Sequence, residues 1–207
     1  MKTISLNELT AQLKSKSSTK RRSAAKKLRK LKCQQAGSLI LSAIETEIQD
    51  TRTWETQYHM IMALSDSSYC DALAYLKKLS LKSHSSTMVD LAIGHAITNL
   101  EFIKFGEIKS LQEWMTSKKT MLLEGAFRAL TMHRITPNNE VIKDSIKYAA
   151  DSKNDGLIFW LTAATPKWPK KLTISFLTFY AKGALLNDIK KAAEAALNGK
   201  YLKWKPL

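Results

Sequence analysis

Apolar residues recur along this chain every 30 to 36 residues, and this period constrains the fold more than any other feature of the sequence. One position of the period, the anchor, is occupied by Leu31, Leu64, Leu100, Leu130, Ala164 and Leu197. The residues three and four places before the anchor are apolar in five of the six copies. These three positions share one face of an α-helix, so each copy predicts a helix with a buried face. A period of this length is typical of a repeated pair of helices.

A second helical pattern lies between successive anchors. Apolar residues at helical spacing group within residues 39–48, 69–79, 108–115, 141–150 and 172–180. Polar or proline-containing segments separate the helices at residues 66–68, 83–86, 136–139, 151–154 and 165–166. The sequence therefore predicts an all-helical chain in which two helices make up each repeat.

Several helix starts are also marked by local sequence. Ser5 and Glu8 form a capping-box pattern, which predicts a short leading helix. Asn138 and Asn187 are predicted N-caps. Because proline is tolerated in a first turn, the Trp168–Pro169 pair predicts a helix start near residue 170.

The positive charge is concentrated at the two ends of the chain. The net charge is +15, of which residues 1–44 carry +10, residues 45–165 carry −2 and residues 166–207 carry +7. Such a surface attracts nucleic acid, an acidic protein or an anionic membrane, although charge by itself also serves solubility. Two distant cysteines and no apolar run of membrane-spanning length predict a soluble, cytoplasmic protein without a disulfide framework.

Two stretches resemble HEAT repeats. Residues 21–31 (Arg-Arg-Ser-Ala-Ala-Lys-Lys-Leu-Arg-Lys-Leu) are similar to the first helix of such a repeat, and residues 50–64 are similar to the turn and first helix of the next copy. The resemblance implies an all-α, HEAT-like α-α solenoid of about five helix pairs. It also implies that Asp50 and Arg52 form one rung of an Asp–Arg ladder. We expect a leading helix and flexible basic tether in residues 1–19, the array in residues 20–199, and a basic, aromatic tail in residues 200–207.

The first candidate site is the basic run at the start of the predicted array. Its members are Lys20, Arg21, Arg22, Lys26, Lys27, Arg29 and Lys30. Like charges four residues apart destabilise a helix, so this crowding favours a polyanion that would neutralise it. The alternative is a solvated helix that ends the array.

Aromatic residues supply the second group of candidates. Trp54, near a helix start, is predicted to line a groove that binds a partner. Trp160 occupies a core position of the repeat, and Trp114 is predicted either to lie in the core or to line the groove. In the tail, Lys203, Trp204 and Lys205 either contact a partner or cap the last helix. His59 and His95 occupy equivalent repeat positions, but no third ligand aligns with them, so no metal site is predicted.

No catalytic or cofactor-binding motif is present in the sequence, so no cofactor is predicted and an enzyme is the less favoured reading. The main hypothesis is a HEAT-repeat scaffold that binds an acidic protein or another polyanion. The alternative is a nucleic-acid-binding protein that clamps a duplex. In length and basic character the chain is also similar to HEAT-like DNA glycosylases. This enzyme hypothesis would need an aspartate beside two aromatic side chains on the concave face, opposite the basic ends.

Overall fold

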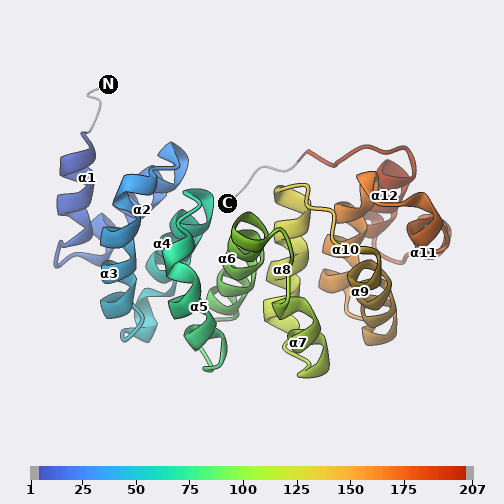
Figure 1. Cartoon of the computed structure of the whole chain (residues 1–207), viewed down its shortest axis with the longest axis horizontal. Coiled ribbons are helices and arrows are strands. Elements are labelled where there is room, and N and C mark those ends of the chain that lie inside the picture. The colour runs from blue at the N-terminus through green and yellow to red at the C-terminus, as the bar shows by residue number, and fades with distance from the viewer. Residues whose placement is uncertain (1–4, 204–207) are drawn as a thin grey trace. The chain divides into compact units, whose positions relative to one another are not determined.

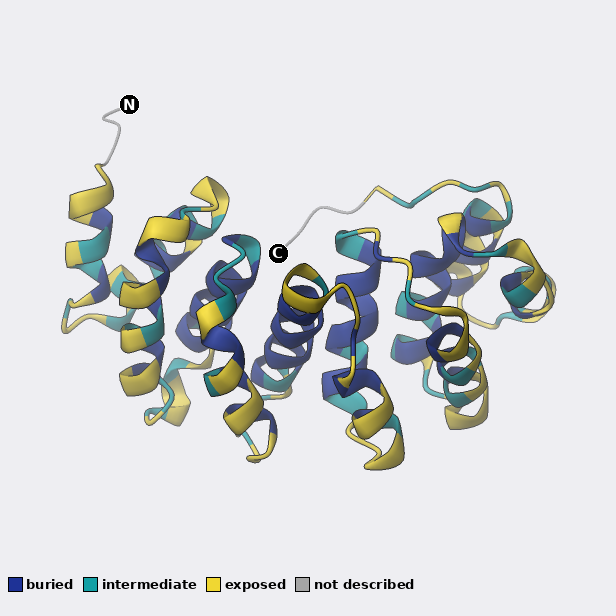
Figure 2. Ribbon diagram, in the orientation of Figure 1, coloured by how far each residue is buried: buried dark blue, intermediate teal, exposed yellow. Residues whose placement is uncertain are grey.

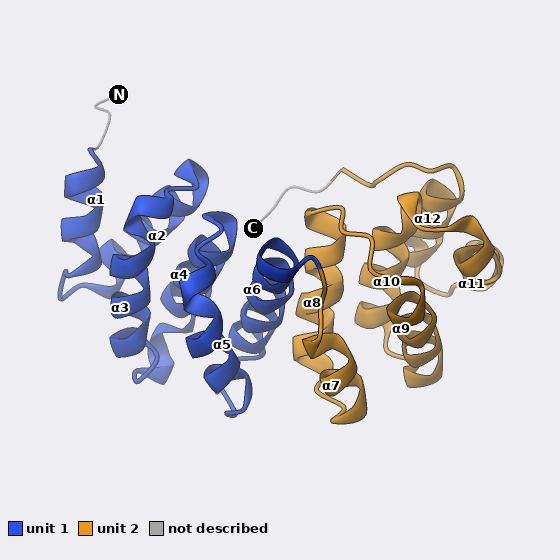
Figure 3. Ribbon diagram, viewed as in Figure 1, with its two compact units in different colours: residues 1–106 blue, residues 107–207 orange. Residues whose placement is uncertain are grey.

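The computed structural model describes residues 5–203 and shows an all-helical protein. This part of the chain forms twelve α-helices and contains no strand (Figure 1). None of its helices is both long enough and apolar enough to cross a bilayer. The chain divides into two compact units, residues 1–106 and residues 107–207 (Figure 3).

Unit 1 contains the first six helices in two layers. They are α1 (Leu6–Leu13), α2 (Ser18–Leu31), α3 (Gly37–Glu47), α4 (Trp54–Asp66), α5 (Leu73–Ser80) and α6 (Thr87–Phe105). Helices α2, α4 and α6 pack side by side, while α3 packs on α4 and α5 packs on α6. Short 3₁₀ turns precede α3, α4 and α5 at Gln34–Ala36, Thr51–Thr53 and Cys70–Ala72.

Unit 2 repeats this plan with the remaining helices. They are α7 (Ser110–Thr116), α8 (Thr120–Met132), α9 (Asn139–Ser152), α10 (Asp155–Ala164), α11 (Lys170–Gly183) and α12 (Asn187–Leu197). Helices α8, α10 and α12 pack in sequence, and α7, α9 and α11 pack on α8, α10 and α12 respectively. The buried Trp168 indole donates a 2.9 Å hydrogen bond to the carbonyl oxygen of Ile135, which joins the α10–α11 connection to the α8–α9 connection.

The core lies where the even-numbered helices meet their neighbours. In α4, every residue from Thr56 to Ser65 is buried, because α2 and α6 flank this helix and α3 covers it. Five of the six anchors are buried or half-buried, but Leu31 is 61% exposed. The prediction that Leu31 lies on the buried face of its helix was wrong, because Leu31 is the last residue of α2 and only Ala24, Ala25 and Leu28 are buried in that helix.

The local start signals are largely confirmed. Ser5 and Glu8 make both hydrogen bonds of a capping box, and the Asn138 side chain accepts from the Val141 amide at 2.9 Å. Helix α11 begins at Lys170 as expected. Asn187 was wrongly predicted as an N-cap, because it is the first residue of α12 and Leu186 occupies the cap.

Candidate polyanion-binding face

The basic residues of α2 fall into two groups around the helix. At about 100° per residue, Lys20, Lys26, Lys27 and Lys30 share an arc of about 120° opposite the buried stripe of Ala24, Ala25 and Leu28. We call these four residues the lysine face. The three arginines of α2 are half-buried, whereas Lys20, Lys26 and Lys30 are exposed.

Arg21 binds a buried carboxylate. Its Nε donates to one oxygen of Glu47, and its Nη2 donates to the other at 2.9 Å. The Glu47 side chain, in the last turn of α3, is only 2% exposed. Nη1 of Arg21 also donates to the carbonyl oxygens of Ser15 and Lys16, at 2.7 and 3.0 Å. One guanidinium therefore connects α2 to α3 and to the segment that leads from α1.

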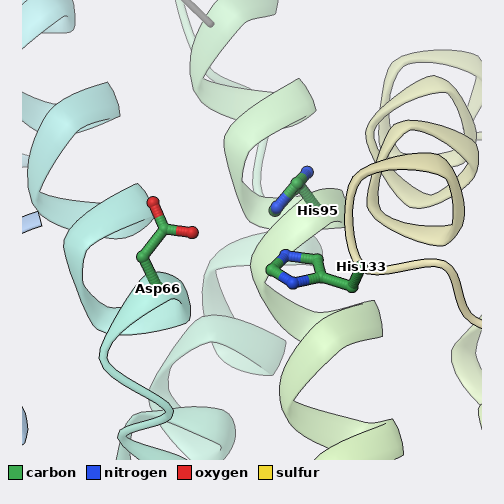
Figure 4. Close-up of side chains that lie close together, drawn as sticks. All are labelled: Asp66, His95 and His133. Carbon is green, nitrogen blue, oxygen red and sulfur yellow. The ribbon is translucent and has the colours of Figure 1, made fainter. Parts of the chain in front are cut away.

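The other two arginines of α2 join it to α4. Arg22 forms an ion pair with Glu55, and the Arg29 Nε lies 2.5 Å from a carboxylate oxygen of Asp66. Asp66 also faces α6, where a ring nitrogen of His95 lies within 4.8 Å of the Asp66 carboxylate (Figure 4). These arginines fasten α2 within unit 1, and their charge is already matched by acids.

The lysine face has no such partners. Lys20, Lys26 and Lys30 are exposed and Lys27 is half-buried. Exposed residues are drawn in yellow in Figure 2. Within residues 5–203, no carboxylate oxygen lies within 4.0 Å of any of the four ammonium groups. The face is thus a compact patch of positive charge that a polyanion could neutralise.

The pKa of the buried His59 imidazole is lowered by burial and by the positive charge of α2. His59 lies on α4, is 8% exposed, and its Nδ1 atom is buried without a hydrogen-bond partner among the described residues. Burial, together with the positive charges of Lys26, Arg29 and Arg22, lowers its pKa from 6.5 to about 4. His59 is therefore neutral at pH 7 and adds no further positive charge beside α2.

The remaining sequence candidates lie outside α2. Trp54 is the first residue of α4 and is 37% exposed. Lys203 is exposed, and Trp204 and Lys205 lie outside the described residues. Asp50 and Arg52 do pair, at 2.8 and 2.9 Å, and this lowers the pKa of Asp50 to about 2. Their pair closes the turn before α4.

Unit 2 contains a polar cluster that the sequence did not reveal. The Glu124 carboxylate, on α8, accepts a hydrogen bond from the Trp160 side chain, and the Arg128 guanidinium lies 5.7 Å from the centre of the Trp160 ring. Burial raises the pKa of Glu124, and the bond from Trp160 and the charge of Arg128 oppose that rise. Gly156 makes room for the carboxylate, since a Cβ atom there would lie 2.7 Å from a Glu124 oxygen.

The repeat period predicts the position of Trp160 on its helix but not its hydrogen bond with Glu124. Trp160 was predicted as a core residue and is half-buried, and Phe159 meets its ring edge-on at 5.2 Å between centroids. Glu124 and Trp160 are 36 residues apart, about one period, so the repeat length was the one available signal that they are neighbours.

No family model matches this chain, and neither the curated proteins nor the solved structures include a match.

Proposed function

We propose that this chain is a HEAT-like helical-repeat protein that binds a polyanionic partner through the lysine face of α2. The architectural part rests on three supports: the period of 30 to 36 residues, the alternation of even-numbered and odd-numbered helices, and the side-by-side packing of the even-numbered helices within each unit. Proteins of this kind use an extended helical surface for binding, and nothing in the sequence calls for chemistry.

The proposed binding role rests on one observation: among the described residues, the arginines of α2 form ion pairs within the protein, and its lysines do not. Its three arginines pair with Glu47, Glu55 and Asp66, whereas no carboxylate of residues 5–203 lies within 4.0 Å of the ammonium groups of its four lysines. Like charges at close spacing cost stability, and no contact within unit 1 offsets that cost on the lysine face. A ligand with regularly spaced negative charges would offset it and would release its own counterions on binding.

The test is binding of labelled polyanions across a salt series. We would measure fluorescence anisotropy with duplex DNA, single-stranded DNA, RNA and a polyglutamate peptide. The variant Lys20→Ala/Lys26→Ala/Lys30→Ala should weaken binding and make the slope of log affinity against log salt shallower by about 2 to 3 for duplex DNA, at roughly 0.9 per lost phosphate contact. The substituted side chains are exposed, so the fold should be retained.

A matched control removes the same charge elsewhere. Lys143, Lys147 and Lys190 are exposed lysines of unit 2, and their replacement by alanine should leave the affinity close to that of the wild type. Equal losses in both variants would mean that net charge alone drives binding and would refute a defined face. Preference for polyglutamate indicates an acidic protein partner, and preference for a nucleic acid supports the alternative function.

A second candidate function, a HEAT-like DNA glycosylase, is favoured by the cluster in unit 2. Glu124 places a carboxylate beside the Trp160 ring, and Phe159 meets that ring edge-on. The acid of this cluster is a glutamate, where the sequence-based expectation named an aspartate. Release of modified bases from alkylated DNA by the wild type, and its loss in Glu124→Gln, would support this function. If the wild type releases no base, the candidate is eliminated.

A further inference from the structure

The outer face of α11 exposes large apolar side chains. Ile174 is 46% exposed and Phe179 is 67% exposed, and the loop that follows presents Leu185, which is fully exposed, and Leu186, which is 48% exposed. Eleven large apolar residues are exposed in the described chain, and four of them fall within these 13 positions. Such a concentration on a water-facing surface is typical of an interaction site.

The helix itself separates this face from its buried side. Helix α11 packs on α9 and α12, and it buries Thr173, Phe176 and Leu177. At about 100° per residue, the opposite side carries Ile174 and Phe179 at its two edges. A shallow hollow of about 610 Å³ lies on this outer side, and Lys182 and Gly183 also line it.

The charge of this face has a single sign. Lys171 and Lys182 lie between Ile174 and Phe179 on the outward side of α11, and both are exposed. No acidic residue occurs between positions 169 and 187. A second copy of the chain would therefore place lysine against lysine, which disfavours self-association through this face and favours an anionic partner.

We propose that this face, which we call the α11 face, docks on an anionic lipid bilayer. Its apolar members are Ile174, Phe179, Leu185 and Leu186, and its cationic members are Lys171 and Lys182. Leu185 lies in the loop between α11 and α12, and its side chain is fully exposed in the described structure, so any cover for it would come from a partner. Fluid acyl chains cover such a side chain without a preformed pocket, while the long lysine side chains reach the headgroup phosphates.

The test is co-sedimentation with lipid vesicles at about 0.15 M salt. We expect binding to phosphatidylcholine vesicles that contain about 30% phosphatidylserine, and at least fivefold weaker binding to pure phosphatidylcholine. Phe179→Ser/Leu185→Ser should lower the partition onto the anionic vesicles at least fivefold. Lys171→Glu/Lys182→Glu should do the same, and all four side chains are exposed, so the fold should persist.

Two matched controls locate the effect on α11. Ile103→Ser/Phe105→Ser removes exposed apolar side chains of unit 1, and Lys78→Glu/Lys82→Glu reverses two of its exposed lysines. Both control variants should bind anionic vesicles as the wild type does, and each variant's circular dichroism and thermal midpoint would confirm that it folds.

Three outcomes would overturn the proposal. The first is a wild-type protein that does not sediment with anionic vesicles. The second is unchanged sedimentation of Phe179→Ser/Leu185→Ser, which would mean that charge alone attracts the protein. The third is that the lysine-face variant of α2 loses vesicle binding while the α11 variants still bind vesicles as the wild type does. Because the two faces are altered separately, failure here leaves the proposed role of α2 intact.

Discussion

Replacing Arg21 with alanine tests the view that the arginines of α2 are structural. The change removes two hydrogen bonds to Glu47 and two to backbone carbonyls, and it leaves the Glu47 carboxylate, which is 2% exposed, without its cation. Removing one partner of a buried ion pair typically costs about 3 to 5 kcal/mol. For a chain of this size, each kcal/mol lowers the thermal midpoint by roughly 2 to 4 °C, so we expect a fall of roughly 6 to 20 °C.

Urea denaturation of the wild type, Arg21→Ala and Lys26→Ala would measure the difference. Lys26→Ala changes an exposed residue of the same helix and should alter the free energy of unfolding by about 0.5 kcal/mol or less. The double variant Arg21→Met/Glu47→Met should recover most of the loss, because no charge is then buried alone. If Arg21→Ala cost less than about 1 kcal/mol, the ion pair would not hold α2 in place and the division between arginine and lysine would lose its basis.

Three further changes test other parts of unit 1. His59 has a pKa of about 4 in the folded protein and 6.5 when unperturbed, so as the pH falls the unfolded chain binds a proton at this residue before the folded chain does. The free energy of unfolding should therefore drop by about 3 kcal/mol between pH 6.5 and 4. In urea titrations at several pH values, His59→Leu should reduce this dependence of the unfolding free energy on pH. Gly37→Ala would place a Cβ atom 2.1 Å from the Tyr69 ring and should cost about 1 to 3 kcal/mol, whereas the same change in a Tyr69→Ala background should cost much less. Ser68 adopts φ 57° just after α4, so Ser68→Gly should raise the thermal midpoint by relieving about 1 kcal/mol of backbone strain, and a lower midpoint would contradict this.

The helices were predictable because their signals are local and periodic. The anchors fall in or near the last turns of α2, α4, α6, α8, α10 and α12, and the intervening apolar groups fall on the odd-numbered helices. Ser5 and Asn138 cap helices because each needs a partner only three residues away. The burial of Leu31 was wrongly predicted for a physical reason. Periodicity shows which face of a helix a residue lies on, but it does not show that the helix ends before a neighbouring helix can cover that residue.

The site was less predictable because its partners are distant in sequence. Arg21 and Glu47 are 26 residues apart, and Arg29 and Asp66 are 37 apart, so no local pattern indicates which basic residues are neutralised. The sequence grouped seven basic residues of α2 as one candidate site. A variant that mixed arginines with lysines would therefore confuse loss of folding with loss of binding, whereas the structure separates the two sets.

The same division extends along the whole chain and explains where the net charge resides. All six arginines are engaged: Arg21, Arg22, Arg29 and Arg52 pair with acids, and Arg128 and Arg134 lie over the rings of Trp160 and Tyr201. Among the lysines in residues 5–203, only Lys77 and Lys109 lie within 4.0 Å of a carboxylate. A planar guanidinium binds carboxylates and rings in fixed geometry, whereas a strongly hydrated ammonium group stays in water. The excess charge of +15 is therefore carried by solvated lysines, and an anionic partner should depend on them far more than on the arginines.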